Sequence, residues 1–316
     1  MTCGSARTAT SQEGVDLYSS FAEIRKAARE RADARVAIPM GYDAASLRAL
    51  IEAASKGLAS SVIVGPADRV TKTLEEMGEE LPPQVDIVDC SDESEAALEA
   101  VRQVSRGEAT VLMKGMLQTS TFLKAVLDKE VGLRSGGILS HVAVVHVPLQ
   151  DRLVAITDGG MNIRPGRDEV VEIARNGAWV IKALGAERAR VALLAAKEVV
   201  SDKMPETVLF GDVARDGIPG MDVCGPIAVD GAMDPDAARI KGMEGPVPGR
   251  ANVLVAPDIA CGNIFAKGFM YMTDAEVGGL IAGATAPVVM LSRSDKPATK
   301  LNSLALGVVV SGGSGA

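Results

Sequence analysis

The sequence predicts an α/β fold built around mainly parallel β-sheet, and three observations support this prediction. Short runs rich in Val, Ile and Leu alternate with helical patterns along most of the chain. Hydrophobic residues make up 47% of the sequence and aromatic residues only 3%, so Ala, Val, Leu and Ile must fill the core, as in parallel sheets covered by helices. The 316 residues correspond to roughly two domains of about 150 residues each.

The first part of the chain is predicted to form a helix followed by a βαβ unit. A helix is expected from about Leu17 to Asp33, and residues 35–43 form a strand and turn. Residues 44–57 form a helix that ends at a glycine, and residues 60–68 form the next strand and turn. Other β-branched runs that end in Gly, Asp, Asn or Ser predict further strands: VDIVDCSD, ATVLMKGMLQ, HVAVVHVPL, LVAITDGG, RVALLAAKE, ANVLVAPDIACGN and PVVMLSRSD.

Two places break the alternation of strands and helices. The runs HVAVVHVPL and LVAITDGG are too close together for a parallel crossover, which predicts a hairpin and an antiparallel pair. The Gly- and Pro-rich residues 216–235 and 241–250 are expected to form surface loops beside a cleft.

The C-terminal part predicts a strand, a polar turn and a helix. Residues 287–291 form a short parallel strand, and the apolar spacing from Thr299 to Val310 predicts a helix. Ser292, Arg293 and Asp295 therefore follow the carboxyl end of a strand, where ligands bind in open α/β sheets.

Charge and cysteine spacing exclude several classes of partner. The net charge is −8 and the basic residues are dispersed, unlike the broad basic surface of nucleic-acid-binding proteins. The cysteines at positions 3, 90, 224 and 261 have no CxxC spacing, which favours reduced thiols. Residues 1–15 lack an apolar signal core, and the apolar run 278–291 is shorter than the ~20 residues of a membrane helix. We therefore expect a cytoplasmic protein without nucleic-acid or membrane partners.

Several common motifs are absent from the sequence. There is no GxGxxG after the first strand, no GxxxxGK[ST] and no GxSxG. His141 and His146 are the only histidines, and five residues apart on one strand they point to opposite faces. At most one of them faces a cleft, and a packing or surface position is the favoured interpretation.

Residues 114–127 combine a strand end with a helix start. Free backbone N–H groups and hydroxyls at a helix start bind anions, and nearby lysines add positive charge. Ordinary helix capping explains the same residues, so both interpretations stay open. The candidate residues are Lys114, Gly115, Thr119, Ser120, Thr121 and Lys124.

Three further polar segments contain candidate residues, and two of them follow predicted strands. Each is also explained by turn formation or helix capping. A divalent metal site is conceivable where three aspartates lie close together, but a helix that starts at Asp234 is favoured there. The segments contain Asp158 and Asn162; Asp258, Gly262, Asn263 and Lys267; and Asp230, Asp234 and Asp236.

Taken in order, five segments resemble the phosphate acyltransferases, a family that includes phosphate acetyltransferase and phosphate butyryltransferase. They are LMKGMLQTSTFLKAVL, GLRSGGILSHVAVVHVP, AITDGGMNIRP, GPVPGRANVLVAPDIACGNIFAK and VVMLSRSDKPATKLNSLAL. The resemblance runs from about Arg35 to Val310, and TSTFLKAVL and SRSDKPATKLNS are closer to the butyryltransferase branch.

The resemblance implies two α/β domains with mainly parallel sheets and an active site in the cleft between them, similar to the isocitrate and isopropylmalate dehydrogenases. Residues 1–139 and 292–316 would form one domain and residues 140–291 the other. The implied reaction converts acyl-CoA and phosphate to acyl phosphate and CoA, reversibly and without a metal. Coenzyme A is then a co-substrate and no cofactor is bound. A butyryl-like or short branched acyl group and a homodimer or larger homo-oligomer are expected.

The resemblance also assigns roles to single residues. Ser292 and Arg293 match the family's Ser-Arg pair, in which the arginine binds the phosphoryl group and stabilises charge on the carbonyl oxygen. Residues 119–121 match the phosphate-binding helix start. Lys124 stands where acetyltransferases have an arginine, and an ammonium cannot bind phosphate through two parallel bonds.

The residue that accepts the thiol proton of CoA is less clearly marked. Acetyltransferases place an aspartate seven residues after the serine, where this sequence has Thr299. Asp295 is the candidate base instead. A turn residue before Lys296, or ionisation of the thiol near cations without a base, fits the sequence as well.

Three other functions stay open from the sequence. The first is phosphate acetyltransferase. The second is a metal- and NAD-dependent decarboxylating dehydrogenase, which shares the two-domain cleft and would use Asp230, Asp234 and Asp258 as ligands. The third is a non-catalytic protein that binds CoA or an acyl phosphate, against which the presence of Ser292 and Arg293 argues.

Overall fold

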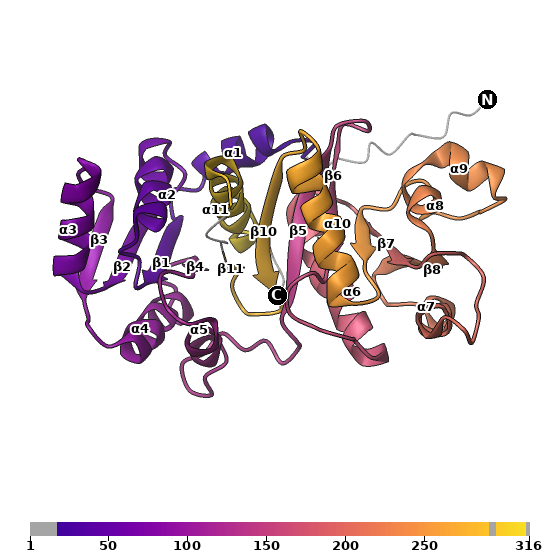
Figure 1. Ribbon diagram of the computed structural model, residues 1–316, viewed down its shortest axis with the longest axis horizontal. Helices are drawn as coiled ribbons and strands as arrows, with labels where there is room; N and C mark the ends of the chain where they lie inside the picture. Colours follow the sequence, from indigo (N-terminus) through magenta and orange to yellow (C-terminus); the bar gives the residue numbers. More distant parts are fainter. Residues whose placement is uncertain (1–17, 291–294, 314–316) are drawn as a thin grey trace, which may run out of the picture.

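A computed structural model describes residues 18–290 and 295–313, and every structural statement concerns these residues. They form one eleven-stranded sheet, which Figure 1 shows extending along the long axis of the molecule. From one edge to the other the strands are β3 (Val85–Asp89), β2 (Ser60–Gly65), β1 (Arg35–Pro39), β4 (Val111–Met113), β11 (Val288–Val289), β10 (Val277–Ala282), β5 (Ser140–Val147), β6 (Arg152–Thr157), β9 (Val253–Val255), β7 (Ala189–Leu194) and β8 (Met221–Ile227).

Helices cover both faces of this sheet, which confirms the predicted α/β class. Aspartate or serine side chains begin several of them by accepting a backbone N–H, for example Asp43 and Asp92. The helices are α1 (Phe21–Arg29), α2 (Ala44–Ser55), α3 (Ala67–Met77), α4 (Glu93–Ser105), α5 (Thr119–Val126), α6 (Arg167–Ala183), α7 (Pro205–Asp216), α8 (Val229–Met233), α9 (Pro235–Ile240), α10 (Ile259–Met272) and α11 (Pro297–Ser311). Among the described residues, no helix is both long and apolar enough to span a membrane.

The first half of the sheet is parallel, as the βαβ pattern predicts. Strand β1 pairs in parallel with β2 and β4, and β11 pairs in parallel with β4, with Val288 opposite Leu112. The predicted C-terminal strand and helix are confirmed as β11 and α11, whereas residues 291–294 of the predicted turn lie outside the described residues. The described cysteines, Cys90, Cys224 and Cys261, form no disulfide.

The strand direction reverses in the middle of the sheet. Strand β10 is antiparallel to both β11 and β5, and β5 is antiparallel to β6, which confirms the predicted hairpin. Strands β6, β9, β7 and β8 are then parallel to one another, opposite in direction to β4. The sheet thus consists of two parallel halves joined through β10 and β5, whereas the proposed division into two domains stays a proposal.

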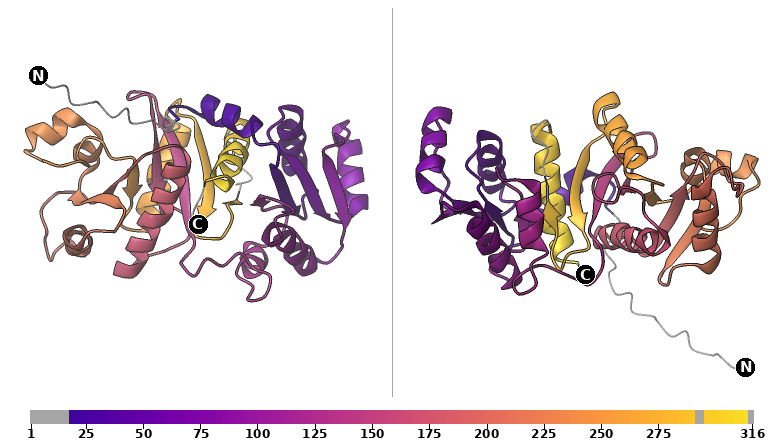
Figure 2. Two further views of the ribbon diagram at one scale, coloured as in Figure 1. Left: turned by 180° about the vertical axis from the view of Figure 1, so that it is seen from behind. Right: turned by 60° about the horizontal axis from the view of Figure 1, so that its bottom comes forward.

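The two faces of β5 and β6 carry different helices. Val142 and Val144 pack with residues of α6, whereas Ala143 and Val145 pack with Ala266 of α10. The views in Figures 1 and 2 show α6 and α10 on opposite sides of these strands. The face under α10 is the one that contains the candidate site.

Two sequence predictions in this part of the fold are wrong. Residues 216–235, predicted as surface loops, contain β8 and α8. Strand β8 includes Gly225 and Pro226 because it lies at the edge of the sheet, where a missing N–H leaves no ladder bond unmade. Strand β10 was not predicted, since the two adjacent glycines at 278 and 279 weaken the strand pattern.

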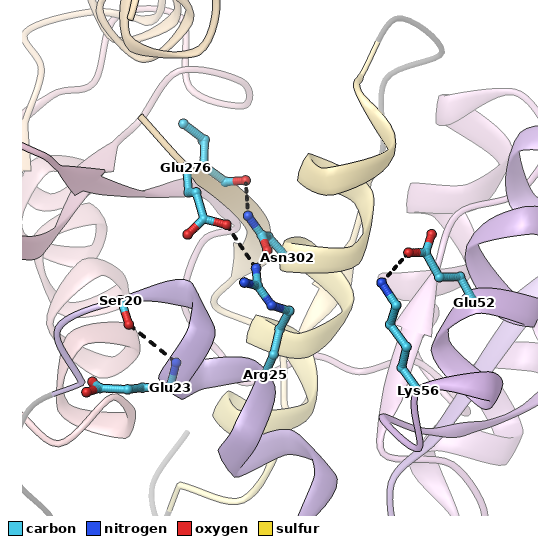
Figure 3. A network of polar contacts seen from close by, with 8 residues as sticks. Ser20, Glu23, Arg25, Glu52, Lys56, Glu276 and Asn302 are labelled. Atoms are coloured by element: carbon cyan, nitrogen blue, oxygen red, sulfur yellow. Dashed lines mark hydrogen bonds and ion pairs between the residues drawn. The ribbon is translucent and has the colours of Figure 1, made fainter. Parts of the chain in front are cut away.

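Helix α1 ties the start of α11 to the central strands. The guanidinium of Arg25 donates 3.0 Å to Glu276 Oε1, just before β10, and also to Asn302 Oδ1 of α11 (Figure 3). On α11, Ser303 Oγ accepts the N–H of Gly279 at 2.9 Å. These bonds fix α11 against β10, where the first turns of the helix face the site.

Candidate active site

A cavity of about 260 Å³ lies against the face of the central strands that α10 covers. Its apolar wall comes from the sheet, from the turn after β6, from α10 and from the end of β11. Its polar lining comes from β5, from α10 and from the segment that leads into α11 and its first turns. The apolar lining includes Ala143, Ile156, Met161, Ala266, Met270, Val277, Ile281 and Met290; the polar lining includes His141, Asn263, Lys267, Tyr271, Asp295, Thr299 and Ser303.

His141, at the start of β5, lies in the wall of this cavity between two glycines. A Cβ atom on Gly279 would lie 3.0 Å from the His141 Nε2 atom, and one on Gly160 would lie 3.0 Å from the His141 Cβ atom. The imidazole therefore occupies space that two missing side chains leave open. Burial lowers the pKa of His141, while the charges of Asp158 and Asp295 oppose that shift.

His146 lies on the other face of the same strand, which confirms the prediction that the two histidines diverge. Its Nε2 atom is 3.1 Å from Asp151 Oδ1 in the turn between β5 and β6. The sequence left open that one of the two histidines faces a cleft, although a packing or surface position was favoured for both. His141 is the one that lines the cavity.

Asp158 holds the turn after β6 against the start of β5. Its Oδ1 atom accepts the backbone N–H groups of His141 (3.1 Å), Gly160 (2.8 Å) and Met161 (3.1 Å). Its Oδ2 atom accepts from the backbone N–H of Asn162 at 2.9 Å and from its Nδ2 at 2.6 Å. With only 3% of its surface exposed, Asp158 acts on the cavity by placing its neighbours. Direct binding of substrate by Asp158 and Asn162 stays a prediction.

Helix α10 brings three of the predicted residues into the cavity wall. Asp258 begins the helix by accepting the N–H of Cys261 at 2.8 Å. Gly262 packs so closely against the turn after β6 that a Cβ atom there would lie 2.2 Å from Asp158 O. Asn263 Nδ2 donates to Gly159 O at 2.9 Å, and Lys267 follows one turn later. Gly262, Asn263 and Lys267 all line the cavity together with Asp295.

The predicted anion-binding segment lies at the end of β4, next to β11. The backbone N–H of Lys114 donates to Val289 O at 2.9 Å, so Lys114 lies beside the strand whose next residue, Met290, lines the cavity. A Cβ atom on Gly115 would lie 2.2 Å from Pro39 O, so the chain turns against β1 there. Helix α5 begins at Thr119 as predicted, without a side-chain cap from Gln118.

The side chains of that helix start face outward. Thr119, Ser120 and Lys124 are exposed and Thr121 is partly buried. None of these four residues belongs to the lining of the cavity described above. Their role in binding an anion stays a prediction.

Part of the predicted catalytic turn lies outside the described residues. Ser292 and Arg293 fall in residues 291–294, about which the structure says nothing. Asp295, directly after them, lines the cavity, as does Thr299, which stands where the acetyltransferases have an aspartate.

The three aspartates considered as metal ligands each have another contact. Asp230 Oδ1 accepts from Lys241 Nζ at 2.8 Å, and this ion pair lowers the pKa of Asp230. Asp234 begins α9 by accepting the N–H of Asp236 at 2.8 Å, which confirms the favoured helix start. Asp258 begins α10. Within residues 18–290 and 295–313 no three His, Cys, Asp or Glu side chains form a group suited to a metal ion.

Several residues that line the cavity were not predicted, although the spacing of residues along α10 indicates one of them. Asn263, Ala266, Lys267 and Met270 are spaced three or four residues apart, as on one face of a helix. Together with the predicted site at Asn263 and Lys267, that spacing indicates Met270 as a further lining residue. The contribution of β5 and β10 depends on their antiparallel pairing, which local patterns do not show.

Comparisons with known proteins agree on one family. The family described as "Phosphate acetyl/butaryl transferase" matches residues 90–308. The phosphate butyryltransferase of Clostridium acetobutylicum is 38% identical over 300 residues, covering 94% of this chain and 99% of that protein. The phosphate acetyltransferase of Rhizobium meliloti is 36% identical over 292 residues, covering 91% of this chain and 92% of that protein.

Solved structures show the same fold. A branched-chain phosphotransacylase from Enterococcus faecalis V583 has a TM-score of 0.78 at 33% identity, covering 89% of this chain and 99% of that one. A phosphotransacetylase from Streptococcus pyogenes has a TM-score of 0.77 at 20% identity, covering 92% of this chain and 99% of that one, and so supports the fold alone.

Proposed function

The chain belongs to the phosphate acetyl/butaryl transferase family and is a phosphate acyltransferase, and we propose that it prefers a butyryl or short branched acyl group to acetyl. The reaction joins acyl-CoA and phosphate to acyl phosphate and CoA, and coenzyme A takes part as a co-substrate. The observation that supports the preference is the apolar wall of the cavity beside the polar side chains of His141, Lys267 and Asp295.

The size and flexibility of that wall suit an acyl chain longer than acetyl. Met161, Met270 and Met290 contribute unbranched thioether side chains, which adapt to chains of different shape. Each methylene group buried in such a wall contributes about 0.8 kcal/mol. Butyryl has two methylene groups more than acetyl, so about 1.6 kcal/mol, or roughly a 15-fold higher kcat/KM, is expected for butyryl-CoA over acetyl-CoA.

For the charged parts of the substrates we propose the residues that the sequence indicates around this cavity. Lys267 is exposed at its edge, and Lys114 lies beside β11. The uncapped start of α5 leaves backbone N–H groups for a phosphate oxygen. Arg293 and Ser292 are proposed to bind the phosphoryl group, on the sequence resemblance alone. A cytoplasmic location and a homo-oligomer also belong to this proposal.

The experiment that tests the function measures phosphate-dependent release of the CoA thiol. The substrates are acetyl-, propionyl-, butyryl-, isobutyryl- and octanoyl-CoA, with EDTA present throughout. Release that requires phosphate and is fastest with butyryl- or isobutyryl-CoA supports the proposal. Fastest release with acetyl-CoA contradicts the proposed preference, and no release with any substrate from folded protein contradicts phosphate acyl transfer on this panel.

A further inference from the structure

The CoA thiol carries a proton that some group must accept, because the thiolate is the nucleophile toward an acyl phosphate. Four titratable side chains belong to the lining of the cavity: His141, Lys267, Tyr271 and Asp295. An ammonium group has only protons to donate. An imidazole ordinarily titrates nearer to physiological pH than a carboxyl or a phenol, which suits a general base.

We propose that His141 is the group that accepts the thiol proton of coenzyme A in this cavity. The inference rests on the proposed acyltransferase function. It goes beyond the sequence prediction, which named Asp295 as the base. Asp295 then acts as the charge that stabilises the protonated imidazole.

The surroundings of His141 fix where its ring lies. The ring lies between Gly160 of the turn after β6 and Gly279 of β10: a Cβ atom on Gly279 would lie 3.0 Å from the ring Nε2 atom, and one on Gly160 would lie 3.3 Å from the ring Cγ atom. The Asp158 carboxylate accepts the backbone N–H of His141 at 3.1 Å and also holds Gly160, so the residue and one of its walls share an anchor. Gly279 is fixed in turn by Ser303.

The charges around the ring suit a reversible proton transfer. Asp158 follows β6 and Asp295 precedes α11, and the negative charge of each favours the imidazolium. Lys267 and Tyr271 line the same cavity from α10. Burial is the largest influence and lowers the pKa of His141, so the neutral ring that accepts a proton predominates at physiological pH.

The proton is conserved through the reaction. Neutral His141 takes the proton of the CoA thiol, and the thiolate attacks the carbonyl carbon of the acyl phosphate. The carbon–sulfur bond forms and the carbon–oxygen bond to the phosphoryl group breaks. The leaving phosphate accepts the proton from the imidazolium and departs as hydrogen phosphate, which returns His141 to its neutral form. In the opposite direction phosphate supplies the proton that the departing CoA thiolate takes up.

The chain offers a matched control because it has only two histidines. His141→Gln removes the proton acceptor and keeps a polar side chain. His146→Gln changes the same strand on its other face, where His146 meets Asp151. We expect kcat to fall at least about 100-fold in His141→Gln, the usual contribution of a general base, and to stay within about twofold of wild type in His146→Gln.

The pH dependence separates a base from a structural residue. In the wild type the rate should fall at low pH as His141 becomes protonated, with a midpoint below the ordinary histidine value. Asp295→Asn removes a charge that raises the pKa of His141, so this midpoint should move to lower pH. In His146→Gln protein the ring of His141 is the only imidazole, and an NMR titration of it should give the same midpoint.

Each outcome bears on one inference. If wild type shows phosphate-dependent CoA release but folded His141→Gln keeps the wild-type rate and acid limb, the histidine inference is wrong and the acyltransferase function stands. If Asp295→Asn abolishes the acid limb, Asp295 is the base and His141 is not. If wild type releases no CoA, the proposed function itself is contradicted.

A second variant keeps the test decisive if His141→Gln does not fold. His141→Ala opens a space between Gly160 and Gly279 that joins the cavity. Added imidazole should then restore at least about a tenth of the lost rate, increasing with the concentration of its neutral form. A folded His141→Ala protein whose low rate does not respond to imidazole contradicts the proposal.

Discussion

Replacement of Gly262 by alanine tests how tightly α10 is held against the turn after β6. A Cβ atom at this position would lie 2.2 Å from Asp158 O, 2.8 Å from Asp158 C and 3.1 Å from Gly159 Cα. An ordinary contact between such atoms is about 3.5 Å, so the helix and the turn must separate by about 1 Å. All three atoms belong to the backbone, and no side-chain rotation can relieve the clash.

The cost of Gly262→Ala follows from this geometry. Overpacking of this kind costs about 1–3 kcal/mol, and the neighbouring bond from Asn263 Nδ2 to Gly159 O, worth about 1 kcal/mol, is stretched as well. We expect the free energy of unfolding to fall by about 2–4 kcal/mol. The same turn carries Gly160, which contacts His141, and a displacement of about 1 Å at a reacting group costs up to about 100-fold in rate.

Gly268→Ala on the same helix is the matched control. A Cβ atom at Gly268 would meet nothing within 4 Å. Alanine is favoured over glycine inside a helix, so this variant should be more stable than wild type by about 0.4–1 kcal/mol, with unchanged activity. Urea unfolding and phosphate-dependent CoA release from butyryl-CoA measure both effects. Equal stability and equal rates for Gly262→Ala and wild type would refute the close packing on which the site depends.

Three further predictions concern the cavity and the helices that support it. Met270→Ala widens the cavity, so the ratio of kcat/KM for hexanoyl-CoA to that for butyryl-CoA should rise roughly 15-fold, as expected for two methylene groups. Met272 is 86% exposed on the same helix, so Met272→Ala should leave this ratio unchanged. An unaltered ratio in Met270→Ala would place the acyl chain elsewhere. Arg293→Ala should lower kcat about 100-fold or more if the arginine stabilises transition-state charge, and a near-wild-type kcat in the folded variant would remove it from the mechanism. Arg25→Ala should lower the free energy of unfolding by about 1–2 kcal/mol in urea titrations, because its bonds to Glu276, just before β10, and to Asn302 of α11 are lost. Lys56→Ala breaks only the exposed ion pair with Glu52 and should lower it by about 0.3–0.5 kcal/mol. Equal losses in the two variants would contradict the proposed role of α1.

The fold was largely predictable because strands and helices carry local signals. Residues 44–57 have an aspartate before the helix and a glycine after it, and the structure confirms both limits, with Gly57 at a φ of 65°. Strand β8 was missed because Gly225 and Pro226 are turn-forming residues in most settings. Only the order of strands shows that they lie at an edge, and that order depends on contacts far apart in the sequence.

The candidate site was predictable only in part, where its residues also carry a local sequence signal. Polar residues that begin α10 were found because they follow a strand, and Gly262, Asn263 and Lys267 do line the cavity. Asp158 was found by the same pattern, yet its carboxylate is occupied by five hydrogen bonds within the protein. A strand-end aspartate looks the same in sequence whether it contacts a substrate or holds a turn. Only its burial and partners distinguish the two.

The reversal of strand direction explains why His141 was set aside from the sequence. Predictions of sites in α/β proteins look to the carboxyl ends of parallel strands, and His141 lies at the amino end of β5. Because β5 is antiparallel to β6, the amino end of β5 lies beside the carboxyl end of β6, where Asp158 accepts the backbone N–H of His141. Because β10 is antiparallel to β5, Ile281 lies between His141 and Val288 of the C-terminal strand. His141 therefore lies beside the carboxyl end of β6 and in line with the start of β11, a position that its own strand does not reveal.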